Sequence, residues 1–196
     1  FVFLAGSDMD YYLEYKMNPR KNDIYWVQYA LKTYSIENAH CHIVQNKNQA
    51  QLLKKGYEQT SYLVRNPIDV TRKYSSPART KTILWVGKSD ERVKRPSIVI
   101  EIAKELIEYN FLMIMNMVIP ETHHKCLLKA KNVRNLSIIE YVPFDKIEYY
   151  FANSYLHLNT STFEGFPNTF LQAAKYGIPT LSLKVDPEKM LSKYGC

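Results

Sequence analysis

Two short stretches of the sequence combine charged, amide and glycine residues in an order that could bind an anion beside hydroxyl groups. The first is TFEGFPNTFLQ, residues 162–172, and the second is GKSDERVKR, residues 87–95. In the first, a carboxylate, a glycine and a proline precede a segment that we expect to be helical, with Asn168 as its N-cap. In the second, Lys88 and Lys94 lie close together. Both stretches follow predicted strands, where open α/β sheets bind their ligands.

The chemistry expected of these residues is recognition of a diphosphate with a sugar on either side. A helix start attracts anions because its first N–H groups lack intrahelical partners and its dipole is positive there. Lys88 and Lys94 would add positive charge to the same anion. Glu164 would repel a phosphate, so it is better suited to accept hydrogen bonds from sugar hydroxyls. Gln172 offers donors and an acceptor to a second set of hydroxyls.

Each of these features also has an explanation that needs no ligand. A glutamate before a helix is often only a favourable charge at the positive end of the helix dipole. Lysines in loops are commonly solvated surface residues. The GxGxxG motif is absent, so the residues give no support to a dinucleotide site. From the residues alone, the anion site and a well-capped helix start remain two open interpretations.

Strands and helices are predicted to alternate on both sides of a linker. Before it, the pattern predicts strands at 1–6, 40–46 and 61–67 and helices at 23–39 and 47–57, the second ended by Gly56. Residues 67–80, PIDVTRKYSSPART, are rich in proline, serine and basic residues and predict a domain boundary. After it we expect strands at 81–87, 110–116, 135–142, 155–161 and 178–185, and helices at 95–109, 121–132, 145–154 and 169–176, the last stopped by Gly177. This alternation predicts doubly wound α/β domains with parallel sheets.

The composition fits a soluble globular protein, with 46% hydrophobic and 23% charged residues among 196. A formal net charge of +7 favours anionic partners, whether nucleic acid, phosphorylated molecules or an acidic membrane face. The three cysteines are far apart, so we expect no disulfide framework and a reducing compartment. No apolar run reaches the length of a membrane span. The N-terminus lacks the basic region of a signal peptide and opens inside a predicted strand, so we expect a fragment of a longer chain.

Three motifs resemble those of the family 4 glycosyltransferases, which have the GT-B fold of two Rossmann-like domains. EGFPNTFLQAAKYGIPTLSL is similar to the family signature, VGKSDERVKRPSIVIEIAKEL to its earlier phosphate loop, and VRNPID to the stretch joining the two domains. They occur in the family's order and spacing. The resemblance implies that both domains are incomplete here. Residues 1–66 would be the C-terminal part of the acceptor-side domain, 67–80 the linker, and 81–196 a truncated nucleotide-sugar donor domain.

The resemblance also implies an activity and a set of site residues. The implied enzyme is a retaining transferase that moves a sugar from a UDP- or GDP-sugar to a glycan or lipid-linked acceptor, with no cofactor or metal ion. Its implied setting is surface polysaccharide or lipopolysaccharide biosynthesis in the cytoplasm, with peripheral association at the inner face of the membrane. The implied catalytic residues are Lys88 and Lys94, which would hold the diphosphate and steady the leaving group, and Glu164, which would lie beside the transferred sugar. The other implied donor-binding residues are Gly87, Gly165, Phe166, Pro167, Asn168, Thr169 and Gln172.

The sequence departs from the family pattern at two of these positions. Lys88 stands where arginine is common, so the charge is kept and the bidentate fork is lost. Gln172 stands where a second glutamate is usual, and we expect it still to bind ribose hydroxyls. The nucleotide base, the sugar and the acceptor are not indicated.

Two other functions fit parts of the sequence. A sugar-nucleotide epimerase would share the architecture, but it would need an acid and base pair that the sequence does not suggest. A nucleic-acid-binding module would account for the charge and the sixteen tyrosines, but the basic residues are spread along the chain and form no known motif. His40 and His42 alternate on a predicted strand without a further ligand nearby, so no metal site is predicted.

Overall fold

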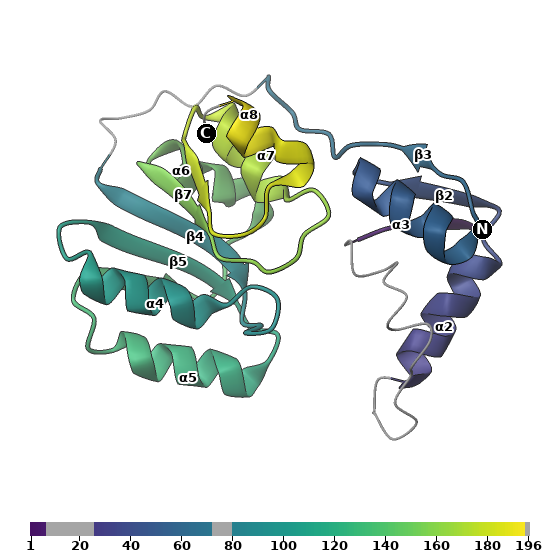
Figure 1. Ribbon diagram of the computed structural model, residues 1–196. Coiled ribbons are helices and arrows are strands. Elements are labelled where there is room, and N and C mark those ends of the chain that lie inside the picture. Colours follow the sequence, from purple (N-terminus) through teal and green to yellow (C-terminus); the bar gives the residue numbers. More distant parts are fainter. Residues whose placement is uncertain (7–25, 72–79, 195–196) are drawn as a thin grey trace. The chain divides into compact units, whose positions relative to one another are not determined.

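The computed structural model describes residues 1–6, 26–71 and 80–194, which divide into two units (Figure 1). The first unit consists of Phe1–Pro67 and Phe163–Phe166, and the second of Ile68–Thr162 and Pro167–Cys196. Both contain a parallel sheet with helices, so the predicted α/β class is confirmed.

The first unit is built on a three-stranded parallel sheet in the order β1-β2-β3. Its strands are β1 (Val2–Leu4), β2 (Cys41–Val44) and β3 (Tyr62–Leu63), and its helices are α2 (Trp26–Glu37) and α3 (Lys47–Tyr57). A small core joins one face of the sheet to both helices through Ala5, Ile36, Val44 and Leu53. These contacts hold the start of α3 directly after β2.

Helix α3 begins and ends through its own local signals. The side chain of Asn46 accepts a hydrogen bond from the Gln49 N–H, which makes it the N-cap. The helix has the predicted bounds, Lys47–Tyr57, but Gly56 lies inside it and does not take the left-handed conformation of a stop. Glu58 closes it in a left-handed conformation, with φ 55°, and its N–H bonds to the Lys54 carbonyl. The predicted end of the helix is therefore confirmed, while the residue that closes it is Glu58 and not the glycine.

The second unit contains a five-stranded, all-parallel sheet in the order β6-β5-β4-β7-β8. Its first elements alternate as β4 (Thr82–Lys88), α4 (Pro96–Glu105), β5 (Asn110–Asn116), α5 (Pro120–Ala130) and β6 (Leu136–Ile139). The chain continues through η2 (Phe144–Lys146), α6 (Ile147–Ala152), β7 (Leu156–Asn159), α7 (Asn168–Lys175), β8 (Thr180–Ser182), η3 (Pro187–Lys189) and α8 (Met190–Tyr194).

Two apolar cores cover the two faces of this sheet, because successive strand side chains point to opposite faces. On one face, Trp85 and Met113 pack with residues of α4 and α5. On the other, Leu84 and Ile114 pack with residues of α6 and α7. Figure 1 shows α4 and α5 together along one side of the strands. With both faces buried, β4 and β5 read as nearly continuous apolar runs, which is how the sequence predicts them.

The direction in which the chain adds strands to the sheet reverses between β4 and β7, so the topological switch point of the sheet lies between these two strands. From β4 the chain winds outward through β5 to β6, and then returns to add β7 on the other side of β4. The two strands pair only at Ile83 with Leu156 and at Leu84 with His157. Beyond these pairs, the loops after β4 and β7 leave the same edge of the sheet. This is the edge at which doubly wound sheets bind ligands.

Two helix boundaries near the C-terminus differ from the prediction. Asn168 is the first residue of α7, and the capping position belongs to Pro167, which makes no side-chain cap bond. The short helix α8 was not predicted. The Asp186 carboxylate begins it by accepting hydrogen bonds from the N–H groups of Leu191 and Ser192. No helix of the described residues is both long and apolar enough to cross a membrane.

Candidate functional site

The loop after β4, which carries both predicted lysines, is organised around Asp90. The Asp90 carboxylate accepts hydrogen bonds from the N–H groups of Arg92 and Val93 at 2.9 and 3.1 Å. Its backbone carbonyl accepts from the N–H groups of Lys94 and Arg95. One aspartate thus folds the loop back on itself, as short polar side chains do in turns.

The first residues of the loop after β7 are hydrogen bonded to this first loop. The Thr160 hydroxyl donates to the Lys94 carbonyl at 2.6 Å and accepts from the Trp85 indole N–H at 2.9 Å. Two residues on, the Thr162 N–H donates to the Val93 carbonyl at 2.8 Å. Within the second unit, Thr162, the first residue of one stretch singled out in the sequence, therefore bonds to the other stretch at the switch point.

Both predicted lysines lie on the β4 side of this junction. Lys88 is the last residue of β4 and is exposed, whereas Lys94 is half-buried. The adjacent Gly87 lies against the Trp85 ring, and a Cβ there would come within 2.7 Å of it. A glycine is therefore required for packing at Gly87, whether or not the residue also contacts a ligand.

Glu164 follows the bonded Thr162 by two residues, a span of at most about 7 Å of chain. The Glu164 side chain is half-buried. It stands at the start of Phe163–Phe166, the segment that belongs to the first unit. In the sequence, this carboxylate therefore comes two residues after the residue through which the loop after β7 bonds to the loop after β4.

Side-chain amides of the first unit hold the backbone of this segment. Asn46 donates to the Gly165 carbonyl and Asn66 to the Phe166 carbonyl, each at 2.8 Å. The Phe166 N–H donates to Gln45 Oε1 at 3.2 Å. A Cβ on Gly165 would lie 2.2 Å from the same oxygen, so only glycine fits. These amide residues are absent from the sequence prediction; the only signal for them was the polar run after the strand HCHIV.

The predicted residues on α7 differ in their exposure. Pro167 and Gln172 are buried, Thr169 is half-buried and Asn168 is exposed. The N–H groups in the first turn of a helix have no intrahelical partners, so this end of α7 has positive character. The buried position of Gln172 limits its amide to groups that reach the inner side of the helix.

Comparison with known proteins identifies the family of this chain. Residues 80–193, more than half of the sequence, match the family model described as glycosyl transferases group 1. The chain belongs to the group 1 glycosyltransferases. None of the curated proteins compared with the sequence matches it.

Solved structures of glycosyltransferases share the fold of this group 1 chain. Anabaena HepE, in complex with UDP and glucose, is 13% identical, with a TM-score of 0.71 over 92% of this chain and 52% of that one. S. aureus TarM, in a mutant form with fondaparinux, alpha-GlcNAc-glycerol and UDP, is 15% identical, with a TM-score of 0.70 over 98% of this chain and 38% of that one. WaaG, a glycosyltransferase involved in lipopolysaccharide biosynthesis, is 17% identical, with a TM-score of 0.69 over 92% of this chain and 55% of that one. The chain therefore has the GT-B type of parallel-sheet fold, and it spans less than two thirds of each of these structures.

A buried histidine lies in β7, the strand that precedes the second of the two loops. His157 in β7 is 1% exposed, and its Nδ1 lies 3.3 Å from the Thr180 hydroxyl. Burial, and to a lesser extent the positive charge of Lys94, lower the pKa of His157 to about 3. The imidazole is therefore neutral at pH 7, and the positive charge of Lys94 disfavours its protonation.

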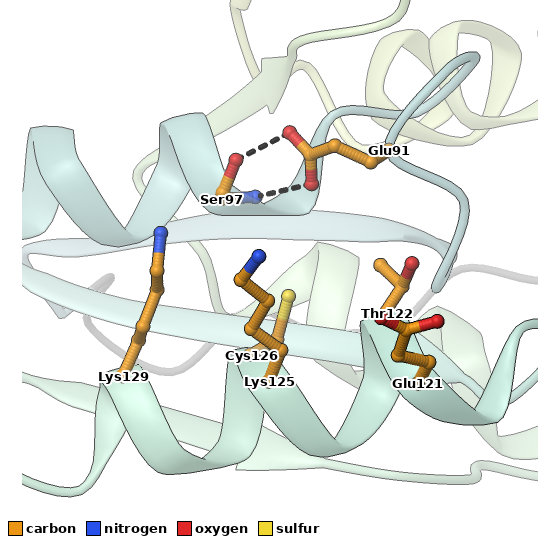
Figure 2. A pocket seen from close by; sticks show the side chains of 7 residues that line it. All are labelled: Glu91, Ser97, Glu121, Thr122, Lys125, Cys126 and Lys129. Atoms are coloured by element: carbon orange, nitrogen blue, oxygen red, sulfur yellow. Dashed lines mark hydrogen bonds between the residues drawn. The ribbon is translucent and has the colours of Figure 1, made fainter.

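A pocket of about 220 Å³ opens elsewhere on the second unit, beside α4 and α5 (Figure 2). The Glu91 carboxylate bonds to the Ser97 N–H and hydroxyl at its rim, while Lys125 and Lys129 of α5 line the opposite side. Cys126 is buried there, and desolvation, reinforced by Glu91, raises the pKa of its thiol, so it packs as a small apolar residue. None of the predicted donor residues lines this pocket.

The described residues contain no group of three or more histidine, cysteine or acidic side chains arranged to hold a metal ion. His42 is buried opposite Phe3, and burial lowers its pKa. Neither of its ring nitrogens has a hydrogen-bond partner in the described part of the chain.

Proposed function

We propose that this chain carries the donor-binding part of a retaining glycosyltransferase. The donor would be a UDP- or GDP-sugar, and the acceptor a glycan or a lipid-linked sugar. We place the reaction in surface polysaccharide or lipopolysaccharide biosynthesis, at the cytoplasmic side of the membrane. TarM and HepE were solved with UDP, and WaaG acts in lipopolysaccharide biosynthesis, which supports this choice of donor and setting.

One observation carries the proposal. The loops after β4 and β7 are hydrogen bonded to each other at the switch point of a sheet whose sequence belongs to the group 1 glycosyltransferases. The loop after β4 supplies Lys88 and Lys94, and the loop after β7 leads into Glu164 and α7. This arrangement supports a donor site in which the lysines supply positive charge and Glu164 and Gln172 bind hydroxyl groups. Family membership favours sugar transfer over the epimerase and nucleic-acid alternatives.

The proposed chemistry depends on stabilising the leaving group. The bond between the anomeric carbon and the diphosphate oxygen breaks, the acceptor hydroxyl oxygen bonds to that carbon, and the hydroxyl proton leaves with the diphosphate. Lys88, Lys94 and the start of α7 stabilise the negative charge that builds on the departing diphosphate. Glu164 accepts hydrogen bonds from hydroxyls of the transferred sugar. Gln172 bonds the ribose, and the backbone of residues 165–169 with Gly87 lets the donor approach closely.

Calorimetric binding of UDP, GDP and ADP to the chain tests this proposal. We expect one diphosphate to bind with a micromolar dissociation constant. Lys94→Ala removes a charge-assisted contact worth about 1.5–3 kcal/mol, which corresponds to a loss of roughly tenfold to a hundredfold in affinity. Glu164→Ala should weaken the nucleotide sugar more than the free diphosphate, because only the sugar contacts that carboxylate.

Lys104→Ala is the matched control, because Lys104 is a lysine of the same unit that pairs with Glu101 in the last turn of α4. It removes the same charge away from the two loops, so its affinity should equal that of the parent chain. If Lys94→Ala and Lys104→Ala weakened binding equally, the anion would be held by general charge and the assigned site would be wrong.

A further inference from the structure

Arg95 occupies a backbone conformation that its residue type does not favour. It ends the loop after β4 with φ 50° and ψ 56°, in the left-handed region. Cβ makes this region unfavourable for residues other than glycine and, to a lesser degree, asparagine and aspartate. The following Pro96 also disfavours the right-handed helical conformation at Arg95. A glycine would make the same turn without strain, so the arginine side chain must contribute something that offsets the strain.

The Arg95 side chain is directed into the structure instead of the solvent. Its Nε–H donates to the Thr160 carbonyl at 2.6 Å, across to the loop after β7. Its Nη2 is buried and bonds to no group among the described residues. Burying a guanidinium donor without a partner costs free energy. The hydrogen bond from Nε to the Thr160 carbonyl opposes that cost and holds the side chain across the two loops.

The bonds between Arg95 and Thr160 form a reciprocal pair around the Lys94–Arg95 peptide. The Thr160 carbonyl accepts a hydrogen bond from the Arg95 Nε–H, and the Thr160 hydroxyl donates one to the Lys94 carbonyl at 2.6 Å. The Trp85 indole N–H fixes that hydroxyl from the sheet. The backbone of Lys94 is thus clamped to the end of β7 from both sides.

We propose that Arg95 is a positioning residue for the donor site: together with Thr160 it locks the loop after β4 onto the loop after β7, so that Lys94 is fixed where the diphosphate binds. This inference rests on the proposed function, because it takes Lys94 to be a diphosphate ligand. Misplacing a contact group by about 1 Å can cost up to a hundredfold in function. Losing the lock should therefore weaken binding without removing any group that touches the ligand.

Two variants distinguish the contribution of the Arg95 side chain from that of the left-handed backbone turn. Arg95→Gly keeps the left-handed turn and removes the cross-loop bond, whereas Arg95→Lys keeps the charge and lacks the Nε–H. Arg92→Gln is the matched control, because Arg92 is an exposed arginine of the same loop that contributes only backbone groups to the bonds described above. It removes one positive charge and leaves the lock intact.

The first readout needs no ligand. The Thr162 N–H bonds across the two loops to the Val93 carbonyl, so its hydrogen exchange reports on the lock. We expect Thr162 exchange to accelerate about tenfold or more in Arg95→Gly and Arg95→Lys, and to stay unchanged in Arg92→Gln. Unchanged exchange in both Arg95 variants would overturn the lock, whether or not the chain binds a nucleotide.

The second readout is the affinity for UDP or GDP, whichever the parent chain binds. We expect a loss of about tenfold in both Arg95 variants. In the Lys94→Ala background, Arg95→Gly should cause no further loss, because there is no lysine left to position. Faster exchange with unchanged affinity, or an equal loss in both backgrounds, would overturn the positioning role while leaving the proposed function intact. Failure of the parent chain to bind UDP, GDP or ADP would overturn the proposed function, and the positioning role with it.

Discussion

His157 shows how strongly one buried residue can tie the stability of the second unit to pH. It packs between the rings of Phe151 and Phe170, and its pKa is lowered to about 3, first by burial and then by the charge of Lys94. An unfolded histidine titrates near pH 6.5. At pH values between the folded pKa of about 3 and the unfolded pKa near 6.5, His157 is protonated in the unfolded chain and neutral in the folded chain. Stability from this group is therefore complete above pH 6.5 and is lost as the pH falls.

We predict that lowering the pH from 7 to 5 reduces the free energy of unfolding by about 2 kcal/mol through His157. Denaturant unfolding at each pH measures this slope. His157→Leu should flatten it, even if the substitution changes the stability at pH 7. The exposed His124 provides the control, since His124→Gln should leave the slope as it is. Equal slopes in the parent chain and in His157→Leu would refute the assignment.

Two glycines near the ends of helices α3 and α7 should respond in opposite ways to substitution by alanine. Gly56 lies inside α3 and its φ is not positive, whereas Gly177 follows α7 with φ 61°. Gly56→Ala should raise the free energy of unfolding by about 0.5–1 kcal/mol, because alanine loses less backbone entropy on joining a helix. Gly177→Ala should lower it by about 1 kcal/mol or more, because alanine is strained in the left-handed region. Thermal or denaturant unfolding compares the two, and shifts of the same sign would contradict these backbone conformations.

The same two glycines show what local sequence can predict. Gly177 stops α7 as expected, since only the left-handed conformation of one residue was needed. Gly56 failed as a stop signal because Glu58 took that conformation. The strand at 110–116 was predicted to the residue, as its buried apolar run has polar residues at both ends. Periodicity and caps are local, so the alternation of strands and helices was predictable.

The contacts that build the candidate site are not local, and the sequence did not indicate them. Thr160 and Arg95 are 65 residues apart, and neither was singled out, because a threonine in a predicted strand and an arginine before a proline look ordinary. Asn46 and Gly165 are 119 apart. The residue types at the strand ends are enough to predict a chemistry, whereas the hydrogen bonds between the loops depend on which strands become neighbours.

At the scale of the whole molecule, strand order links fold to function. The return from β6 to β7 creates the switch point beside β4, and the loops after β4 and β7 both leave the sheet at that edge. The chain spans 38% of the TarM structure and 52% of the HepE structure. What this chain contributes to the proposed reaction is the set of groups from the loops after β4 and β7.

The location of the donor can be mapped directly in a chain of 23.0 kDa by nitrogen-15 NMR with added UDP or GDP. We predict that the largest amide shift changes fall in residues 87–95 and 160–172, and that Lys94→Ala abolishes them at the same nucleotide concentration. Changes centred instead on the α4–α5 pocket of Figure 2, around Lys125 and Lys129, would contradict a donor site at the switch point.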